Sequence, residues 1–254
     1  MKKKIEPLAP PQNYSIEELK TRLQTLESNG FLPIFGRDRN AAIGESLEVY
    51  LGLKLNSSRS ADWGNYELKT TSMGSNRKIS LFNVKWQFQN DYTALNLVKQ
   101  YGKIHHSKHL DLPVIRLDWD IMHSTTPIDE LYINFPANDG PLTLNYAERQ
   151  IALALRADVQ KWFKNKFKNL VIIEVRKEKI NEVDGFLIQN AFLYSDTSFE
   201  NFITLIHTQE INMTFKLMLI QPETPNEKFN NRGSGFRTPQ SVISKLYSDK
   251  EKLL

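Results

Sequence analysis

The chain of 254 residues has the composition of an ordinary globular protein, with 40% hydrophobic and 24% charged residues. No apolar run approaches the ~20 residues that a membrane-spanning helix requires, and the segment after Met1 lacks the apolar core of a signal peptide. The absence of cysteine excludes disulfides and thiolate metal sites and fits a cytoplasmic protein, while the net charge of +4 is compatible with a polyanionic partner without requiring one.

Two helices are predicted near the N-terminus, after a proline-rich, basic lead-in over residues 1–14 that we expect to be poorly ordered at its start. The first helix begins at a capping box of Ser15 and Glu18 and ends near Gly30. The second follows a basic loop and ends at Gly52. Its apolar face consists of Ile43, Leu47, Tyr50 and Leu51, and Glu48 lies beside that face.

The stretch over residues 62–69 contains the main candidates for catalytic residues. Around Glu67 and Lys69 the apolar and polar residues alternate with a period of two, so both side chains are expected on one face of a strand. Asp62 precedes this strand, behind a turn at residues 64–65. Paired carboxylates suit a hard cation such as Mg²⁺, and a neighbouring lysine can hold or activate a water. This is the D-x(n)-E-x-K pattern of metal-dependent nucleases, although a solvated strand face can carry the same letters by chance.

The next segment alternates strands with basic loops. Strands are predicted over residues 66–71 and 79–86, joined by a loop that contains Arg77 and Lys78, and a helix over residues 93–101 is stopped by Gly102. Three histidines follow within residues 103–109. On a helix, His105 and His109 would share a face with a zinc-like spacing, but no suitable further ligand stands nearby, and a phosphate-contacting or solvated basic segment is the alternative.

The second half is predicted to alternate strands and helices. Strands of a hairpin or meander are expected over residues 114–119 and 131–135, with Asp118 and Asp120 as a second, weaker metal-site hypothesis. The longest helix is predicted over residues 145–167, with Ile151, Leu155, Val159 and Phe163 in its core stripe. A central strand at 170–175, a segment at 186–194, a helix at 198–207 and a strand at 213–220 follow. A polar loop at 222–235 then leads to a short helix with Val242, Ile243 and Leu246.

Three separated stretches, residues 43–48, 62–69 and 232–237, resemble one family in order and approximate spacing: the MutH-like endonucleases, and among them the MvaI/BcnI restriction enzymes. The resemblance runs from about Glu17 to the end of the chain. It implies a mixed α/β, restriction-endonuclease-like (PD-(D/E)XK, MutH-like) fold with two lobes around a DNA-binding cleft. A catalytic lobe would comprise roughly residues 15–110 with parts of the C-terminal half, and a DNA-recognition lobe roughly residues 111–240.

The resemblance also implies an activity and its residues. Asp62, Glu67 and Glu48 would hold Mg²⁺, and Lys69 would orient or polarise the water that attacks a phosphodiester. The implied protein is a type II restriction endonuclease that acts on double-stranded DNA as a monomer, beside a cognate DNA methyltransferase. Residues expected to contact DNA are Arg232, Arg237, Asn230, Asn231, Arg77, Lys78, His105, His106 and His109.

The C-terminal loop bears on specificity. Arg232 and Arg237 suit bidentate contact with guanine, although a phosphate contact or an internal ion pair would equally account for either. The restriction relatives have a histidine where this chain has Asn230, which pairs naturally with adenine, so the target is expected to differ from theirs. The alternatives are a MutH-type mismatch-repair nickase, a catalytically silent DNA-binding protein on the same fold, and an unrelated α/β protein.

Overall fold

The computed structural model describes residues 6–35, 42–54, 61–74, 78–89, 92–107, 110–128, 130–231 and 234–254. The chain forms two compact units, each built from separate stretches of sequence. The first unit comprises Met1–Arg77, Lys164–Thr197 and Ser244–Leu254, and the second comprises Lys78–Phe163 and Ser198–Ile243. The division falls within helix α4 (Arg156–Phe167) and within the 3₁₀-helix η1 (Gln240–Lys245).

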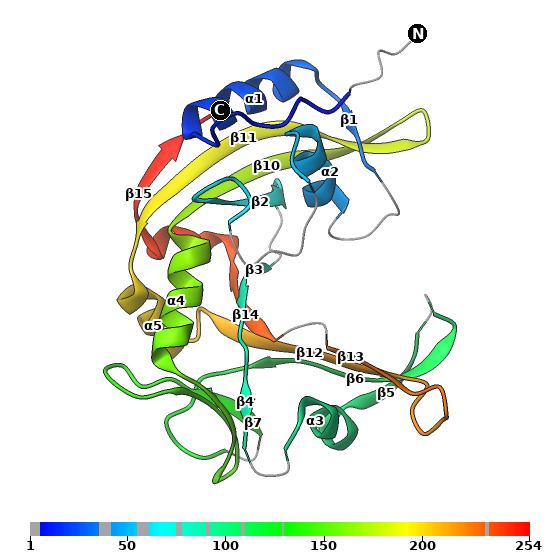
Figure 1. Ribbon diagram of the computed structural model, residues 1–254, viewed down its shortest axis with the longest axis vertical. Coiled ribbons are helices and arrows are strands. Elements are labelled where there is room, and N and C mark those ends of the chain that lie inside the picture. Colours follow the sequence, from blue (N-terminus) through cyan, green and yellow to red (C-terminus); the bar gives the residue numbers. More distant parts are fainter. Residues whose placement is uncertain are drawn as a thin grey trace. The chain divides into compact units, whose positions relative to one another are not determined.

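The first unit is a five-stranded sheet with two helices (Figure 1). The sheet has the order β1-β11-β10-β2, and β15 also pairs with β11. Its strands are β1 (Leu32–Pro33), β2 (Tyr66–Ser72), β10 (Asn169–Ile180), β11 (Val183–Thr197) and β15 (Tyr247–Lys252). The helices are α1 (Ile16–Ser28) and α2 (Ala42–Tyr50). Strand β10 is parallel to β2, and Leu170 lies opposite Glu67.

Local sequence signals explain why these elements form. Helix α1 begins as predicted, because the Ser15 side chain accepts a hydrogen bond from the Glu18 backbone N–H. Three of its leucines, Leu19, Leu23 and Leu26, are fully buried in one cluster with residues of α2 and β10. Strand β10 lies between β11 and β2, which explains its continuous apolar run and confirms the central strand predicted at residues 170–175.

The described part of the lead-in contacts Arg22, whose guanidinium donates to the backbone carbonyls of Ala9, Pro10 and Leu51. The same guanidinium forms an ion pair with Glu18 at 2.7 Å. Glu18 also accepts from the backbone N–H groups of Gln12 and Asn13, and the Leu8 N–H donates to the Tyr50 carbonyl, so several contacts attach the lead-in from residue 6 onward to the first unit.

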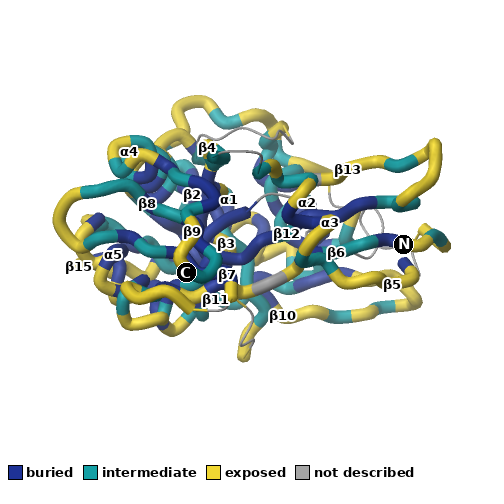
Figure 2. The backbone as a smooth tube through the Cα atoms, turned by 90° about the horizontal axis from the view of Figure 1, so that it is seen from below, coloured by how far each residue is buried: buried dark blue, intermediate teal, exposed yellow. Residues whose placement is uncertain are grey.

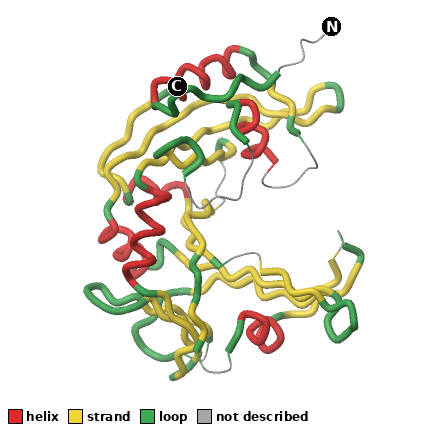
Figure 3. Tube along the Cα trace, in the orientation of Figure 1, coloured by secondary structure: helices red, strands yellow, loops and turns green. Residues whose placement is uncertain are grey.

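The second unit holds two sheets, drawn in yellow with its helices in red in Figure 3. The six-stranded sheet has the order β3-β14-β12-β6-β5, with β13 also paired to β12, and the four-stranded sheet has the order β4-β9-β8-β7. The strands of the larger sheet are β3 (Lys78–Asn83), β5 (Lys103–Ser107), β6 (Leu112–Ile121), β12 (Asn212–Ile220), β13 (Lys228–Asn231) and β14 (Gly235–Pro239). Those of the smaller sheet are β4 (Gln87–Phe88), β7 (Leu131–Asn134), β8 (Leu142–Tyr146) and β9 (Arg149–Ala154). Helices α3 (Ala94–Tyr101) and α5 (Phe199–His207) and the part of α4 up to Phe163 also belong to this unit.

Aromatic side chains form much of the core of the second unit. Phe202 contacts Phe82, Phe163 and Phe236, with ring centroids 5.5, 5.0 and 4.9 Å away. These rings come from the helices α5 and α4 and the strands β3 and β14, so the cluster joins segments that are distant in sequence.

The prediction of one long helix over residues 145–167 is wrong for the first half of that range. Residues 142–154 form the hairpin β8–β9, which turns at Ala147 with φ +49°, and only α4 is helical. Leu155, assigned to the core stripe, is 50% exposed. The apolar residues of this segment recur at a spacing that also suits a helix. In the structure, β8 and β9 pair with β7 and β4, and Leu144 and Ile151 are fully buried.

Three further expectations are corrected. Residues 103–107 of the histidine-rich segment form the strand β5, so His105 does not lie on a helix, and His109 lies outside the described residues. The strands at 114–119 and 131–135 are not a hairpin, because β6 and β7 belong to different sheets. The chain after η1 forms the strand β15 beside β11, which the sequence did not reveal.

None of the helices in the described part of the chain is long and apolar enough to cross a membrane.

Candidate active site

Asp62 is positioned by a tight turn directly before β2. Trp63 and Tyr66 exchange two backbone hydrogen bonds, of 2.9 and 2.8 Å, across a two-residue loop. The loop begins at Gly64, whose φ of +58° lies in the left-handed region that glycine adopts without strain. The turn directs Asp62 back toward the strand, where its Oδ2 accepts a hydrogen bond from the Leu68 N–H at 3.1 Å.

Glu67 and Lys69 lie on one face of β2, as their spacing predicts, and their side chains form an ion pair. Glu67 is fully buried, and its Oε1 also lies 3.3 Å from the Nζ of Lys166. Its other oxygen, Oε2, is buried and has no hydrogen-bond partner among the described residues. One oxygen of Glu67 is therefore held by two ammonium groups, and the second remains available to a ligand.

The electrostatics of Glu67 reflect this position. Burial raises the pKa of Glu67 above its ordinary value, and the charge of Asp62 raises it further, whereas Lys69 and Lys166 oppose the rise. An additional positive charge beside the free oxygen would stabilise the ionised form of the Glu67 carboxylate, because both burial and the charge of Asp62 disfavour that form.

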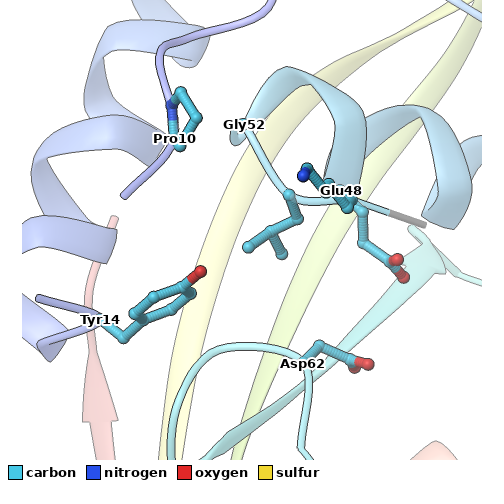
Figure 4. Close-up of a pocket in the computed structure, with 7 residues that line it drawn as sticks. Pro10, Tyr14, Glu48, Gly52 and Asp62 are labelled. Carbon is cyan, nitrogen blue, oxygen red and sulfur yellow. The ribbon is translucent and has the colours of Figure 1, made fainter. Parts of the chain in front are cut away.

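Glu48 joins this group from α2. Burial raises the pKa of Glu48 to about 7, and the charges of Asp62 and Glu67 contribute to the rise while Lys69 opposes it. Glu48 and Asp62 line one cavity of about 400 Å³, in which their carboxylates lie near each other and the Tyr14 ring lies on the other side (Figure 4). Three carboxylates from α2, the turn and β2 thus influence one another.

These residues are compatible with Mg²⁺, although no group of three or more histidine, aspartate or glutamate side chains in the described ranges is already arranged to hold a metal ion. The donors of Asp62, Glu67 and Glu48 are all carboxylate oxygens, which hard divalent cations prefer. The unpartnered Oε2 of Glu67 is a buried acceptor that such a cation would satisfy.

Lys166 is a site residue that sequence reasoning missed. The sequence did not place Lys166 among the candidate residues, yet its ammonium contacts Glu67. The end of α4 is held by Tyr247 of β15, whose hydroxyl donates to the Phe167 carbonyl at 3.1 Å. Burial, followed by the charge of Glu67, raises the pKa of Tyr247 well above its ordinary value. In the sequence, Lys166 lies four residues before Leu170, the residue opposite Glu67 on the neighbouring strand. Its proximity to Glu67 can be recognised only once the pairing of β10 with β2 is known.

The residues expected to contact DNA fall mainly on the six-stranded sheet of the second unit. Lys78 of β3 forms an ion pair with Asp120 of β6, and Arg237 of β14 also acts on Asp120 through its charge. Asn230 is exposed on β13. Arg77, His109, Arg232 and the side chain of Asn231 lie outside the described residues.

Strand β5 is largely exposed (Figure 2). Its two described histidines are consecutive and therefore point to opposite faces of the sheet. His106 Nε2 contacts the Asp111 carboxylate at 2.9 Å, whereas His105 lies opposite Val114 on the other face. The structure therefore does not bring His105 and His106 together.

The second metal-site hypothesis, at Asp118 and Asp120, gains no support from the described residues. Asp120 is occupied by the Lys78 ammonium and by the hydroxyl of Thr214, which donates at 2.6 Å. Burial alone would raise the pKa of Asp120, but these two hydrogen bonds and the nearby charges of Lys78 and Arg237 lower it below its ordinary value.

Metal-free protein is expected to become less stable as pH rises from about 4.5 to 7, in part through Glu48. The ordinary pKa of Glu48 is 4.5 and the folded value is about 7, so within this window the folded state keeps a proton that the unfolded state releases. The contribution of Glu48 to the free energy of unfolding is therefore lost as pH rises through the window and is constant above it. Urea unfolding with a chelator at about pH 5 and about pH 7.5 measures the effect.

Glu48→Gln should reduce this pH dependence, whereas Glu17→Gln, which changes an exposed carboxylate of α1, should leave it unchanged. An equal pH dependence in wild type and Glu48→Gln would contradict the burial of Glu48 as its cause.

Comparison with known proteins identifies a matching family and similar solved structures. The sequence model of the MvaI/BcnI restriction endonuclease family matches residues 20–247. A solved complex of the restriction endonuclease MvaI with cognate DNA substrate has a TM-score of 0.77 and 16% identity, covering 94% of this chain and 99% of that chain. The restriction endonuclease MvaI in the absence of DNA has a TM-score of 0.52 and 12% identity, covering 97% of this chain and 100% of that chain. No curated protein sequence matches.

The structural similarity, at these low identities, concerns the fold, and it confirms the predicted restriction-endonuclease-like mixed α/β architecture. The family rests on the sequence match, which covers most of the chain. The protein belongs to the MvaI/BcnI restriction endonuclease family.

Proposed function

We propose that this protein is a type II restriction endonuclease that hydrolyses phosphodiester bonds of double-stranded DNA at a specific sequence, with Mg²⁺ as its cofactor and as a monomer. The observation that carries the proposal is the electrostatic coupling of Glu48, Asp62 and Glu67 in a member of a restriction endonuclease family. Perturbed carboxylates of this kind are typical of catalytic sites.

The carboxylates would hold the metal. Bound through Asp62, Glu67 and Glu48, Mg²⁺ would neutralise charge on the phosphate and favour deprotonation of an attacking water. The burial of Glu67 keeps bulk water away from its free oxygen, so that this oxygen remains available.

Lys69 would orient or polarise the attacking water. Its ammonium is held against Glu67 Oε1, so the position of its charge is defined by β2 rather than by solvent. A defined donor near the reacting atoms lowers the barrier more than a mobile one, because it is already oriented when charge develops on the phosphate.

DNA recognition would come largely from the second unit. Lys78, Arg237 and Asn230 lie on its six-stranded sheet, together with His105. A cognate DNA methyltransferase is expected as a functional partner, because a site-specific nuclease would otherwise cut the DNA of its own cell.

The deciding experiment is incubation of the purified protein with unmethylated plasmid and Mg²⁺, followed by sequencing of the product ends. We expect linear DNA with one recurring end sequence and no product with a chelator present. Nicked circles that never become linear would favour a MutH-type nickase. Retention of intact plasmid across diverse DNA would contradict an autonomous restriction enzyme and favour a silent DNA-binding protein.

Lys166→Met is expected to slow cleavage by about 10- to 100-fold, a range typical for partners that orient metal-binding side chains. The reason is that Lys166 holds the same oxygen of Glu67 as Lys69 does, 3.3 Å away, and helps to keep that carboxylate ionised. The rate is measured in single turnover with supercoiled plasmid. Lys164→Met, at an exposed lysine of the same helix, is the matched control. Equal rates for the two variants would show that Lys166 does not support the site.

A further inference from the structure

One face of the six-stranded sheet of the second unit is apolar. The other, the polar face, carries the charged side chains of the sheet and also includes Val114 and Met218, which are buried. On β12, Met213, Phe215 and Leu217 are buried along one face, and α3 contacts β12 and β6. The alternating residues Thr214 and Lys216 belong to the other face, because successive side chains of a strand point to opposite sides.

Strand pairing extends the polar face over the whole sheet. Thr214 lies opposite Asp120, Lys216 opposite Asp118, and Met218 opposite Arg116. The register continues from Arg116 to Lys103 on β5, from Met218 to Asn230 on β13, and from Asn212 to Arg237 on β14. The basic residues of this face are Lys78, Lys103, Arg116, Lys216, Lys228 and Arg237.

The basic residues outnumber the two acids, so the face is complementary to a polyanion. One acid, Asp120, does not reduce this complementarity strongly, because Lys78 and Thr214 occupy both of its carboxylate oxygens. The charge of Asp120 therefore has an internal role, which is to hold Lys78 against the sheet.

Asp118 is different. It is exposed, and it has no hydrogen bond or ion pair with any residue that the structure describes. An unpaired carboxylate in the middle of a basic face would repel a phosphate backbone. It would be favourable against the edge of a base that offers an amino group, because an aspartate can accept from the N4 amino group of cytosine in the major groove.

We infer that Asp118 is a specificity-determining residue that accepts a hydrogen bond from cytosine in the DNA target, on a sheet face whose basic residues hold the surrounding backbone. The inference rests on the proposed function for the identity of the partner. The carboxylate acts in two ways. It accepts a hydrogen bond from the correct base edge, and it repels a phosphate or a base edge that presents only acceptors.

The test compares Asp118→Ala with Asp118→Asn and with the control Asp139→Ala, which changes an exposed aspartate outside the sheet. Each protein is incubated with Mg²⁺ and a library of randomised DNA, and the cleaved ends are sequenced. We expect Asp118→Ala to lose the preference for a C·G pair at one position by about tenfold or more. Asp118→Asn should show a smaller loss, because its amide oxygen can still accept.

Loss of the negative charge should also strengthen binding to unrelated DNA at low salt. The inference is overturned if Asp118→Ala and Asp139→Ala give the same sequence profile. It is also overturned if Asp118→Ala weakens binding to all sequences equally, since a contact to the backbone behaves in that way.

A second readout separates this inference from the proposed function. Glu67→Ala and the double variant Glu67→Ala/Asp118→Ala are used to select bound sequences from the same library without cleavage. If wild type cuts no DNA but the selected motif changes at one C·G position in the double variant, the endonuclease proposal fails and the inference holds. If wild type cuts and both selected motifs are identical, the inference fails and the endonuclease proposal holds.

Discussion

Glu67→Ala and Lys69→Ala are each expected to abolish DNA cleavage, with rates about a thousandfold or more below wild type, while DNA binding is largely retained. Glu67 is the most buried carboxylate of the site and supplies the oxygen without a partner. Lys69 supplies an ammonium that is paired with the other oxygen of Glu67, Oε1. In the proposed mechanism both residues would act on the reacting phosphate rather than on the sequence that is recognised.

DNA binding is expected to be retained because positive charges remain at the site. Removal of Glu67 leaves Lys69 and Lys166 in place, with side chains 25% and 23% exposed, so they reach solvent and can still attract a phosphate. Binding is measured by electrophoretic mobility shift with a chelator present, and folding by circular dichroism. Lys164→Ala, on the exposed side of α4, is the control for loss of a positive charge. Cleavage at the normal rate by either site variant would show that the assignment of the active site is wrong.

Trp63→Ala is expected to lower the free energy of unfolding by about 3–5 kcal/mol, the cost typical of removing a large buried aromatic side chain. Trp63 is fully buried beside Asp62, and its indole Nε1 donates to the Ser15 carbonyl at 3.0 Å. Its ring also contacts Tyr14, with centroids 5.4 Å apart, and lies under the Arg22 guanidinium. The turn that presents Asp62 is thus anchored in the core of the first unit.

Trp63→Phe is the companion variant, because it keeps most of the apolar contact and loses the hydrogen bond. Its expected cost is nearer 1 kcal/mol from that bond, plus a smaller packing loss. Urea unfolding monitored by far-ultraviolet circular dichroism measures both variants. Cleavage by Trp63→Ala, assayed where it is still folded, should also fall, because Asp62 is displaced with the turn. An unfolding midpoint of Trp63→Ala equal to that of wild type would refute the anchoring role.

Local signals were sufficient for several parts of the molecule. The capping box at Ser15 predicted α1, and the Thr93 side chain caps α3, the helix predicted over residues 93–101, by accepting from the Asn96 N–H. The period of two around Glu67 predicted that Lys69 would share its face. Each of these features depends on residues within a few positions of one another, so their geometry is set by backbone sterics and local hydrogen bonds.

Other features depended on partners that are distant in the chain. The segment over residues 142–154 has a spacing compatible with a helix, and only its pairing with β7 and β4 makes it a hairpin. Strand β15 has no strong local signal, and its pairing with β11 defines it.

The sequence by itself determined the candidate residues for the proposed chemistry: Asp62, Glu67 and Lys69 within eight positions, and Glu48 on the preceding helix. Only the tertiary structure decided their environment. Parallel pairing of β10 with β2 places the end of α4 beside Glu67, so that Lys166 becomes a second ammonium at the same oxygen. The physical reason is that burial and long-range charge set the state of a carboxylate, and neither is encoded in the residues next to it.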